Sequence, residues 1–438
     1  MTKSYPLEES DIIFDNENQT FEDVGMSINS SLEGIVATEE LLNETTDDGL
    51  KKLISLEFNW LPREVVEAYN SETDPEKKKE LLVKLVYSNC KLNCKGCYVK
   101  NDGLFGEDDL LYPDQIMDLI EDAVKNLGTV TLKYLGPSEF FRDKDVFQYL
   151  DRFEKMGITL NIFAKDPMFG DDKEVEELFG EQGIHTSEEL VKKLSEYKSL
   201  RILYNFRTFD DELTNDLVSG GYEGKEDYHR NYKNVQNKSI KLLHKYFVKP
   251  ELEKGKESRL VILNTPIVQE TIDESFEIFK YFTDRDIPVC STTSMKSGCG
   301  GELYEGIDER FIDDFAYYYA QAIDYSIKRG IITEEDLEKT GPSPYAGMAH
   351  CMQLCNGVLI RSTGKLLRCP GADDEEWAEK ITPEELLEEG LSGVWPKTKN
   401  YARKSKVGIR CHAKPGIFTE KFNEQVLEYY RAITQYGA

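Results

Sequence analysis

The sequence predicts the α/β fold class, as a partial (β/α)6 TIM-like barrel, and two observations predict it. From about residue 81, short apolar runs suited to buried parallel strands alternate with amphipathic runs suited to helices. The runs that qualify as strands number six, fewer than a closed barrel needs, so the barrel is expected to be open. They cover residues 82–87, 130–135, 159–163, 201–206, 260–264 and 287–290.

The helices between these strands have recognisable starts and interruptions. Pro113 and Asp114 open a helix expected over 113–127, because proline and an acidic residue suit a first turn. A charged stretch over about 170–197 carries two helical patterns around Gly183, and we expect it to be an insertion between the third and fourth strands. The expected domains are an acidic N-terminal extension over 1–80, the barrel over 81–300 and a C-terminal domain over 301–438.

The chain is strongly acidic. Its 438 residues carry a formal net charge of −28, and residues 1–50 hold 13 Asp or Glu against one Lys or Arg. Attraction to nucleic acid or to an anionic membrane depends on Lys and Arg contacts to phosphates, so neither partner is expected. A basic peptide partner suits this charge, although an acidic surface also serves solubility alone.

Cysteine usage indicates a reducing compartment. The chain has nine cysteines and no N-terminal apolar signal segment, which favours thiols kept for metal over disulfides, so a cytoplasmic protein is expected. No apolar run approaches the length that crosses a bilayer, and the protein is therefore also expected to be soluble.

Three cysteines stand together directly after the first strand. Cys90, Cys94 and Cys97 are separated by three and then two residues, and no fourth Cys or His lies near them. A cubane iron–sulfur cluster has four irons, so three thiolates leave one iron free for a ligand that is not protein. A zinc site, which usually takes four ligands, is the alternative for this loop.

This loop resembles the signature of the radical S-adenosylmethionine (radical SAM) superfamily, Cys-x3-Cys-x2-Cys after the first barrel strand. The resemblance implies that a [4Fe-4S] cluster on Cys90, Cys94 and Cys97 binds SAM through its free iron and cleaves it to a 5′-deoxyadenosyl radical. The superfamily usually has an aromatic residue just before the third cysteine, where this chain has Gly96. Tyr98, just after that cysteine, is expected to take part of its place near the adenine.

The run after the second strand also resembles a superfamily element. Gly136, Pro137, Ser138 and Glu139 resemble its Gly-Gly-Glu-Pro loop in a degenerate form, which implies a contact with the methionyl amino group of SAM. A plain Gly-Pro turn after a strand is the alternative.

Polar residues follow the fourth and fifth strands. Asn205, Arg207 and Asn264 are expected at the ribose or the carboxylate of SAM, because chemistry in α/β barrels collects on the loops that follow the strands. For Arg207 an ordinary ion pair on the barrel rim is the alternative.

A predicted β-hairpin brings two more cysteines together near the C-terminal end. Segments 358–361 and 365–368 flank a turn at Gly364, which suits the positive φ that such turns need. The hairpin is expected to bring Cys355 and Cys369 within reach of one metal. A four-cysteine zinc ribbon is one possibility for this region.

The same region resembles the SPASM/Twitch extension of radical SAM enzymes, where Cys351, Gly364 and Cys369 match the start of an auxiliary iron–sulfur site. With Cys355 and Cys411 the resemblance implies four thiolates, enough for a second, closed [4Fe-4S] cluster. It implies a small Twitch-like β-hairpin/helix domain at the C-terminal end. The segment also resembles the auxiliary-site segment of the GTP cyclase of molybdenum-cofactor biosynthesis.

Two cysteines remain outside these groups. Cys290 ends an apolar strand, as a core thiol does. Cys299 stands in a Gly-rich run after the sixth strand, where it could be a hydrogen-atom donor, a metal ligand or neither.

The resemblance implies an enzyme that abstracts a hydrogen atom from its substrate and takes electrons from a reductant such as flavodoxin or ferredoxin. We favour modification of a ribosomally made peptide or protein, by a thioether or carbon–carbon crosslink, dehydrogenation or epimerisation. Synthesis of a small-molecule cofactor or metabolite is the alternative, and a non-enzymatic iron–sulfur electron-relay protein is a further one.

Overall fold

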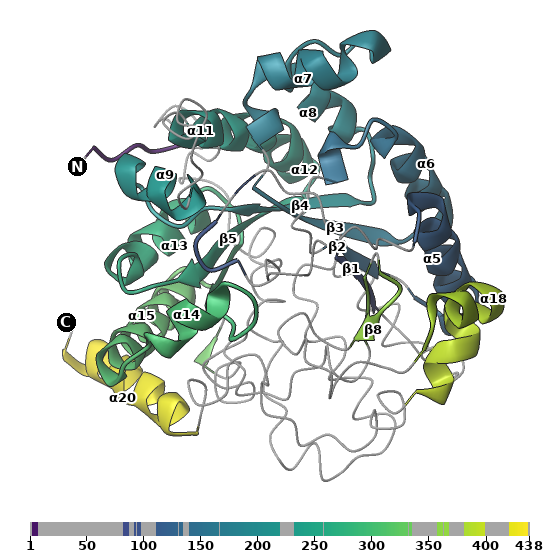
Figure 1. Cartoon of the computed structure of the whole chain (residues 1–438). Helices are drawn as coiled ribbons and strands as arrows, with labels where there is room; N and C mark the ends of the chain where they lie inside the picture. The colour runs from purple at the N-terminus through teal and green to yellow at the C-terminus, as the bar shows by residue number, and fades with distance from the viewer. Residues whose placement is uncertain are drawn as a thin grey trace.

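A single curved sheet with helices around its outer side organises the molecule in the computed structural model (Figure 1). The described cysteine loop of the candidate site follows a strand of this sheet. The structure describes residues 2–7, 82–86, 92, 94–97, 111–129, 131–134, 140–165, 167–219, 232–256, 258–331, 333–334, 357–361, 363–367, 381–398 and 420–436.

Six strands are parallel to their neighbours, as a partial (β/α)6 barrel requires. The order across the whole sheet is β6-β5-β4-β3-β2-β1-β7-β8. The predicted set of six parallel strands is therefore confirmed. Their bounds are β1 Leu82–Val86, β2 Thr131–Tyr134, β3 Thr159–Ala164, β4 Leu200–Asn205, β5 Leu260–Ile267 and β6 Val289–Thr293.

The last two of these strands differ from the prediction. β6 was predicted over 287–290 but begins at Val289, because Pro288 has no N–H to give to the sheet, and it continues to Thr293. β5 runs on to Ile267 through a register shift against β6 that begins after Asn264. Apolar runs in a sequence do not reveal such irregularities.

The predicted C-terminal hairpin is present, and it joins the barrel sheet. β7 (Gly357–Arg361) pairs antiparallel with β8 (Leu366–Leu367), around a turn in which Gly364 has a φ of 77°. β7 also pairs in parallel with β1 along five residues, so the hairpin extends the barrel beyond β1 and has no separate sheet of its own. The division into domains at residue 301 stays a prediction.

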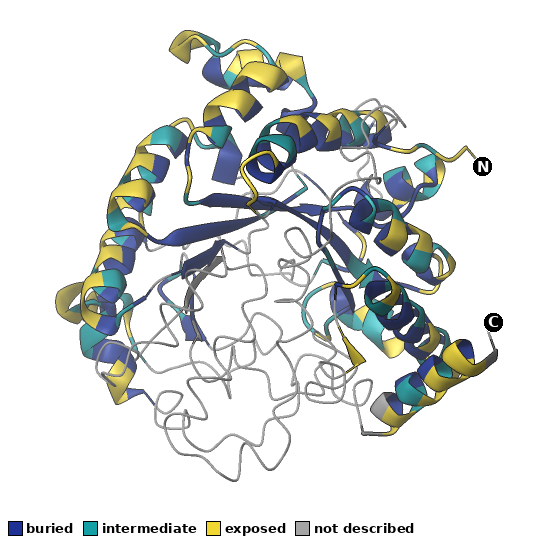
Figure 2. Cartoon of the chain, turned by 180° about the vertical axis from the view of Figure 1, so that it is seen from behind, coloured by how far each residue is buried: buried dark blue, intermediate teal, exposed yellow. Residues whose placement is uncertain are grey.

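Helices pack on the outer face of the sheet, with their buried sides inward and their exposed sides outward (Figure 2). α18, which follows the hairpin, packs beside α5 on the outer side of the sheet. The helices described are α5 Pro113–Leu127, α6 Val146–Met156, α7 Asp172–Phe179, α8 Ser187–Ser195, α9 Asp211–Ser219, α11 Tyr232–Leu243, α12 Lys249–Leu252, α13 Ser275–Thr283, α14 Gly300–Glu305, α15 Glu309–Lys328, α18 Pro383–Val394 and α20 Glu420–Tyr436.

Two helix predictions are confirmed by particular residues. α5 covers the predicted range, and the side chain of Gln115 accepts the Tyr112 N–H at 2.8 Å at its start. The insertion between β3 and β4 consists of α7 and α8, and Gly183 between them has the positive φ of 78° that ends a helical turn.

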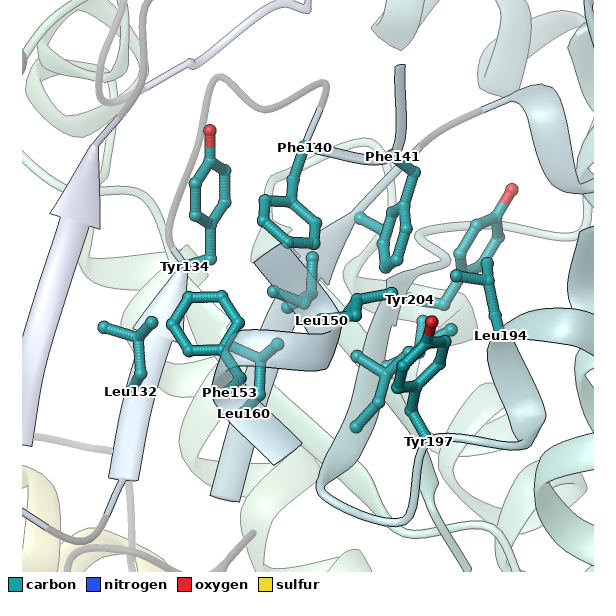
Figure 3. Packing of buried hydrophobic residues seen from close by; sticks show 14 of the residues in the cluster. Leu132, Tyr134, Phe140, Phe141, Leu150, Phe153, Leu160, Leu194, Tyr197 and Tyr204 are labelled. Atoms are coloured by element: carbon teal, nitrogen blue, oxygen red, sulfur yellow. The ribbon is translucent and has the colours of Figure 1, made fainter. Parts of the chain in front are cut away.

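The main core lies between the sheet and these helices. Figure 3 shows its aromatic part, where Phe140 and Phe141 contact edge to face at 5.4 Å between ring centroids and Phe153 lies close by. A second core, between β5, β6 and the C-terminal helices, includes Phe315 and Phe422. Across the described ranges no helix is long and apolar enough to cross a membrane.

Candidate functional site

The cysteine loop follows β1 at the carboxyl end of the sheet. Cys94 is buried and Cys97 is half-buried, and the Cys97 N–H donates to the Cys94 carbonyl at 3.3 Å. Of the other residues predicted here, Cys90 and Tyr98 lie outside the described residues. Two of the three thiols expected to act together thus belong to one cluster, in which Cys94 packs with Val218 and Tyr232 and Cys97 packs against them.

The backbone of this loop favours glycine at Gly96, and the residue lies close to α14. Its φ is 74°, and a Cβ added there would lie 2.3 Å from Cδ1 of Leu303 on α14. Leu303 of α14 therefore lies directly against the cysteine loop at Gly96.

The Gly-rich run after β6 lies directly against the cysteine loop. A Cβ on Gly300 would lie 2.6 Å from the carbonyl oxygen of Met295 and 3.4 Å from that of Gly96. Cys299, the residue before α14, is exposed beside this contact. The run therefore brings an exposed thiol to the rim of the site.

Arg207 connects the loop after β4 to the cysteine loop. Its guanidinium is buried, and Nη1 donates to the Lys95 carbonyl at 3.3 Å. Burial lowers the pKa of Arg207, and attraction to Cys94 and Cys97 opposes that shift. Asp210, three residues after Arg207, was a possible partner for an ion pair on the barrel rim. Its carboxylate instead accepts the Leu213 N–H at 2.7 Å, near the start of α9.

Lys165 is a second cation at the same place, and sequence reasoning missed it. Its ammonium group is attracted by the Cys94 and Cys97 thiols, and the Tyr232 hydroxyl donates to its backbone carbonyl at 2.9 Å. Burial and then the charge of Arg207 lower the pKa of Lys165, while the two thiols oppose the shift. The signal in the sequence was a lysine placed directly after Ala164, the last residue of β3.

The two cations define the electrostatics of the site. Positive charge beside Cys94 and Cys97 stabilises negative charge on sulfur, which is what a thiolate-bound, anionic iron–sulfur group requires. Among the described residues no three His, Cys, Asp or Glu side chains converge on one metal position. The third cysteine of the loop, Cys90, is outside those residues.

The strand ends beside the cysteine loop carry buried polar side chains. Asn205 donates to the Thr265 carbonyl at 2.5 Å, which links β4 to β5. Asn264 is fully buried, and neither its Nδ2 nor its Oδ1 has a hydrogen-bond partner in the described part of the chain. Thr293 and Ser294, which sequence reasoning did not single out, have buried and unpartnered hydroxyls at the end of β6 within the same described ranges. Such groups fit a bound polar ligand or ordered water.

The remaining predicted residues divide into two groups. Cys290 is buried with Leu203, Val261 and Leu263, which is the core position that the sequence indicated. The others lie outside the described residues and keep the status of predictions: Gly136, Pro137, Ser138, Glu139, Cys351, Cys355, Cys369 and Cys411.

Comparison with known proteins gives similarity in structure only. No protein-family model matches the chain, and no curated protein sequence matches it significantly. The fold is similar to that of native anSMEcpe with bound AdoMet, with a TM-score of 0.50 and 15% identity over 80% of this chain and 97% of that one. At this identity the similarity shows the fold, a half-barrel α/β architecture that in the compared protein holds AdoMet, that is, SAM.

Two further solved structures match more loosely. Methylornithine synthase (PylB) gives a TM-score of 0.30 at 13% identity, over 68% of this chain and 77% of that one. HydG, a maturase of the [FeFe]-hydrogenase, gives a TM-score of 0.35 at 11% identity, over 98% of this chain and 93% of that one.

Proposed function

We propose that this chain is a radical SAM enzyme. The observation that carries the proposal is the position of Cys94 and Cys97 at the carboxyl end of the parallel sheet, near the half-buried Lys165 and the buried Arg207. The spacing of these cysteines with Cys90 and the similarity of the fold to an AdoMet-bound protein support it. The barrel loops are also where such folds carry their chemistry.

The donor set fits an iron–sulfur cluster with one open iron. Cys90, Cys94 and Cys97 would hold it, and when bound with SAM it supplies an electron that releases a 5′-deoxyadenosyl radical for hydrogen-atom abstraction. Lys165 and Arg207 stabilise the negative charge of the thiolates and of any carboxylate brought beside them. The unpartnered groups of Asn264, Thr293 and Ser294 orient polar parts of the ligand.

A second cluster near the C-terminal end is part of the proposal. The chain enters β7 and leaves β8 at the same end of the hairpin, because the two strands are antiparallel. Cys355 comes two residues before Gly357, where β7 begins, and Cys369 comes two residues after Leu367, where β8 ends. Both cysteines are therefore next to the open end of the hairpin. Together with Cys351 and Cys411 they are proposed to hold an auxiliary [4Fe-4S] cluster, with zinc as the alternative metal.

The substrate is proposed to be a ribosomally made peptide or protein. The net charge of −28 favours a partner with basic residues and disfavours nucleic acid. Cys299, exposed on the loop that contacts Gly96, is a candidate hydrogen-atom donor for an epimerisation. A cofactor precursor or metabolite is the second candidate, and a crosslink or dehydrogenation would use the auxiliary cluster as the acceptor of an electron.

Anaerobic reconstitution tests the proposal. The purified chain is incubated with iron and sulfide, then with dithionite and SAM, and iron, zinc and 5′-deoxyadenosine are measured. We expect about eight irons per wild-type chain, from two cubane clusters. The Cys94→Ala variant should lose about half of the iron and all 5′-deoxyadenosine, whereas Cys369→Ala should lose the other half of the iron.

Cys290→Ala is the matched control, because Cys290 packs in the core with apolar neighbours. It should keep the full iron content and the SAM cleavage. Tightly bound zinc in place of iron, or an iron-loaded protein that leaves SAM intact, would contradict the proposal and favour a metal-stabilised or electron-relay protein.

A further inference from the structure

Residues 2–7 lie along the loop that follows β4 and bond to its backbone. The Ser4 N–H donates to the Phe209 carbonyl at 2.8 Å, and the Asp211 N–H donates to the Thr2 carbonyl at 3.0 Å. The Ser4 hydroxyl also hydrogen-bonds the Asp211 carboxylate. This segment, here called the strap, thus pairs with the loop as a short antiparallel strand would.

Glu274 contacts both the strap and the loop through its carboxylate. Glu274 accepts the Thr208 hydroxyl at 2.5 Å and the Phe209 N–H at 2.9 Å, and it pairs with Lys3 Nζ at 2.5 Å. Burial raises the pKa of Glu274, but the bonds from Lys3, Thr208 and Phe209 outweigh it and lower the pKa overall. The carboxylate is therefore charged at neutral pH and joins both segments.

Aromatic contacts hold the rest of the strap. The Tyr5 ring stacks on Phe209 with 4.4 Å between centroids. The Tyr281 hydroxyl, on α13, accepts the Leu7 N–H at 2.9 Å and donates to the Leu7 carbonyl at 2.7 Å. Leu7 is buried, so the strap ends in the core rather than on the surface.

The loop under the strap leads to the middle of the cysteine loop. Arg207 donates to the Lys95 carbonyl at 3.3 Å. Near the end of α9, Leu217 accepts the Lys95 N–H at 2.9 Å and Asp216 pairs with Lys95 Nζ at 2.5 Å. Lys95 lies between Cys94 and Gly96, so the unit from Arg207 to α9 holds it by its N–H, its carbonyl and its ammonium group.

We infer that the strap positions the cysteine loop through the unit from Arg207 to α9, with Lys3, Tyr5 and Glu274 as positioning residues. The strap makes none of the contacts to Lys95 itself, and it acts by fixing the start of the unit that makes them. This inference concerns the described residues alone and does not need the metal to be bound. Only its consequence for the cluster depends on the proposed function.

Amide hydrogen exchange in the metal-free full chain tests the inference. The Lys3→Met variant removes the ammonium from Glu274, and Tyr5→Ala removes the ring from Phe209. Each should speed exchange of the Phe209 and Asp211 amides, and also of the Lys95 amide, by about fivefold, the effect of losing one modest interaction. The amides within α15 should keep their protection, since α15 lies in the second core.

Lys245→Met is the matched control. Lys245 is also a half-exposed lysine in an ion pair, with Glu188 at 2.6 Å, but it contacts Glu188 and Tyr246, which belong neither to the strap nor to the unit from Arg207 to α9. It should leave the Lys95 amide unchanged. If Lys3→Met and Tyr5→Ala open residues 207–211 while the Lys95 amide keeps its protection, or if all amides lose protection equally, the strap has no positioning role.

A double-mutant cycle on the reconstituted chain gives a second readout. Arg207→Gln removes a positive charge beside Cys94 and Cys97, so the cluster's midpoint potential should fall. Lys3→Met should lower it in the same direction by a smaller amount, and should have no further effect in the Arg207→Gln background. Shifts that add would show that the strap does not act through Arg207. A chain that binds no cluster would contradict the proposed function, and the exchange experiment would still decide the inference.

Discussion

Replacing Gly96 by alanine tests whether the cysteine loop is fixed by packing against α14. The added Cβ meets two costs: a left-handed backbone at a φ of 74°, about 1–2 kcal/mol, and an approach of 2.3 Å to Leu303 Cδ1. The second cost is at most about 1 kcal/mol, because Cδ1 ends a flexible, half-buried side chain that can turn away. The free energy of unfolding should therefore fall by about 1–3 kcal/mol. Because the residue stands between Cys94 and Cys97, iron loading after reconstitution should fall as well.

Two matched variants separate the costs. Gly157 has a φ of 69° and no atom within 4 Å of an added Cβ, so Gly157→Ala should show the backbone cost alone. The Leu303→Ala change removes the clashing Cδ1, so Gly96→Ala should cost less in that background, close to the Gly157→Ala value. Urea unfolding of the wild type, the three single variants and the Gly96→Ala/Leu303→Ala double variant measures these terms. An equal loss for Gly96→Ala and Gly157→Ala, or no relief from Leu303→Ala, would refute the packing argument.

Three further predictions concern charged groups. Glu274 has a pKa below its usual value of 4.5, so its bonds stabilise the fold above that pH and are lost as pH falls through its lowered pKa. Glu274→Gln should therefore reduce the loss of unfolding free energy between about pH 5 and pH 3, measured by urea titrations. Burial lowers the pKa of Lys233 to about 7, so above pH 7 the unfolded chain binds more protons than the folded chain. The free energy of unfolding should therefore rise from pH 7 toward pH 10. Denaturant titrations at several pH values should show this rise in the wild type and not in Lys233→Met. Arg142 and Glu174 form a buried ion pair, so Arg142→Met should destabilise by about 3–5 kcal/mol in urea, and a loss under 1 kcal/mol would contradict a buried pair.

Much of the barrel could be predicted from local patterns. Apolar runs marked the six parallel strands, and Pro113 with the following acidic residue marked the start of α5. These features depend on short stretches of chain, in which side-chain period and helix capping act over a few residues. The start of β6 was misplaced because an apolar run does not show where Pro288 interrupts the hydrogen bonds.

The site was predicted in its chemistry and only partly in its geometry. The spacing of Cys90, Cys94 and Cys97 indicated a metal loop, and Arg207 was found by its place after a strand. Lys165 was missed because a lysine after a strand is common, and only the curvature of the sheet brings it to Cys94. The sequence also did not indicate that Leu303 of α14 lies against Gly96.

The sequence by itself determined the α/β class, the order of the strands along the chain and the presence of a cysteine loop with an arginine after the fourth strand. Tertiary structure alone decided that β7 pairs with β1, that residues 2–7 pack on the loop after β4, and that α14 covers Gly96. The reason is physical: the pairing of β1 with β7 and the contact of Ser4 with Asp211 join residues more than 200 positions apart in the chain. Such contacts depend on which edges and faces remain uncovered once the barrel has formed, and no local pattern records that.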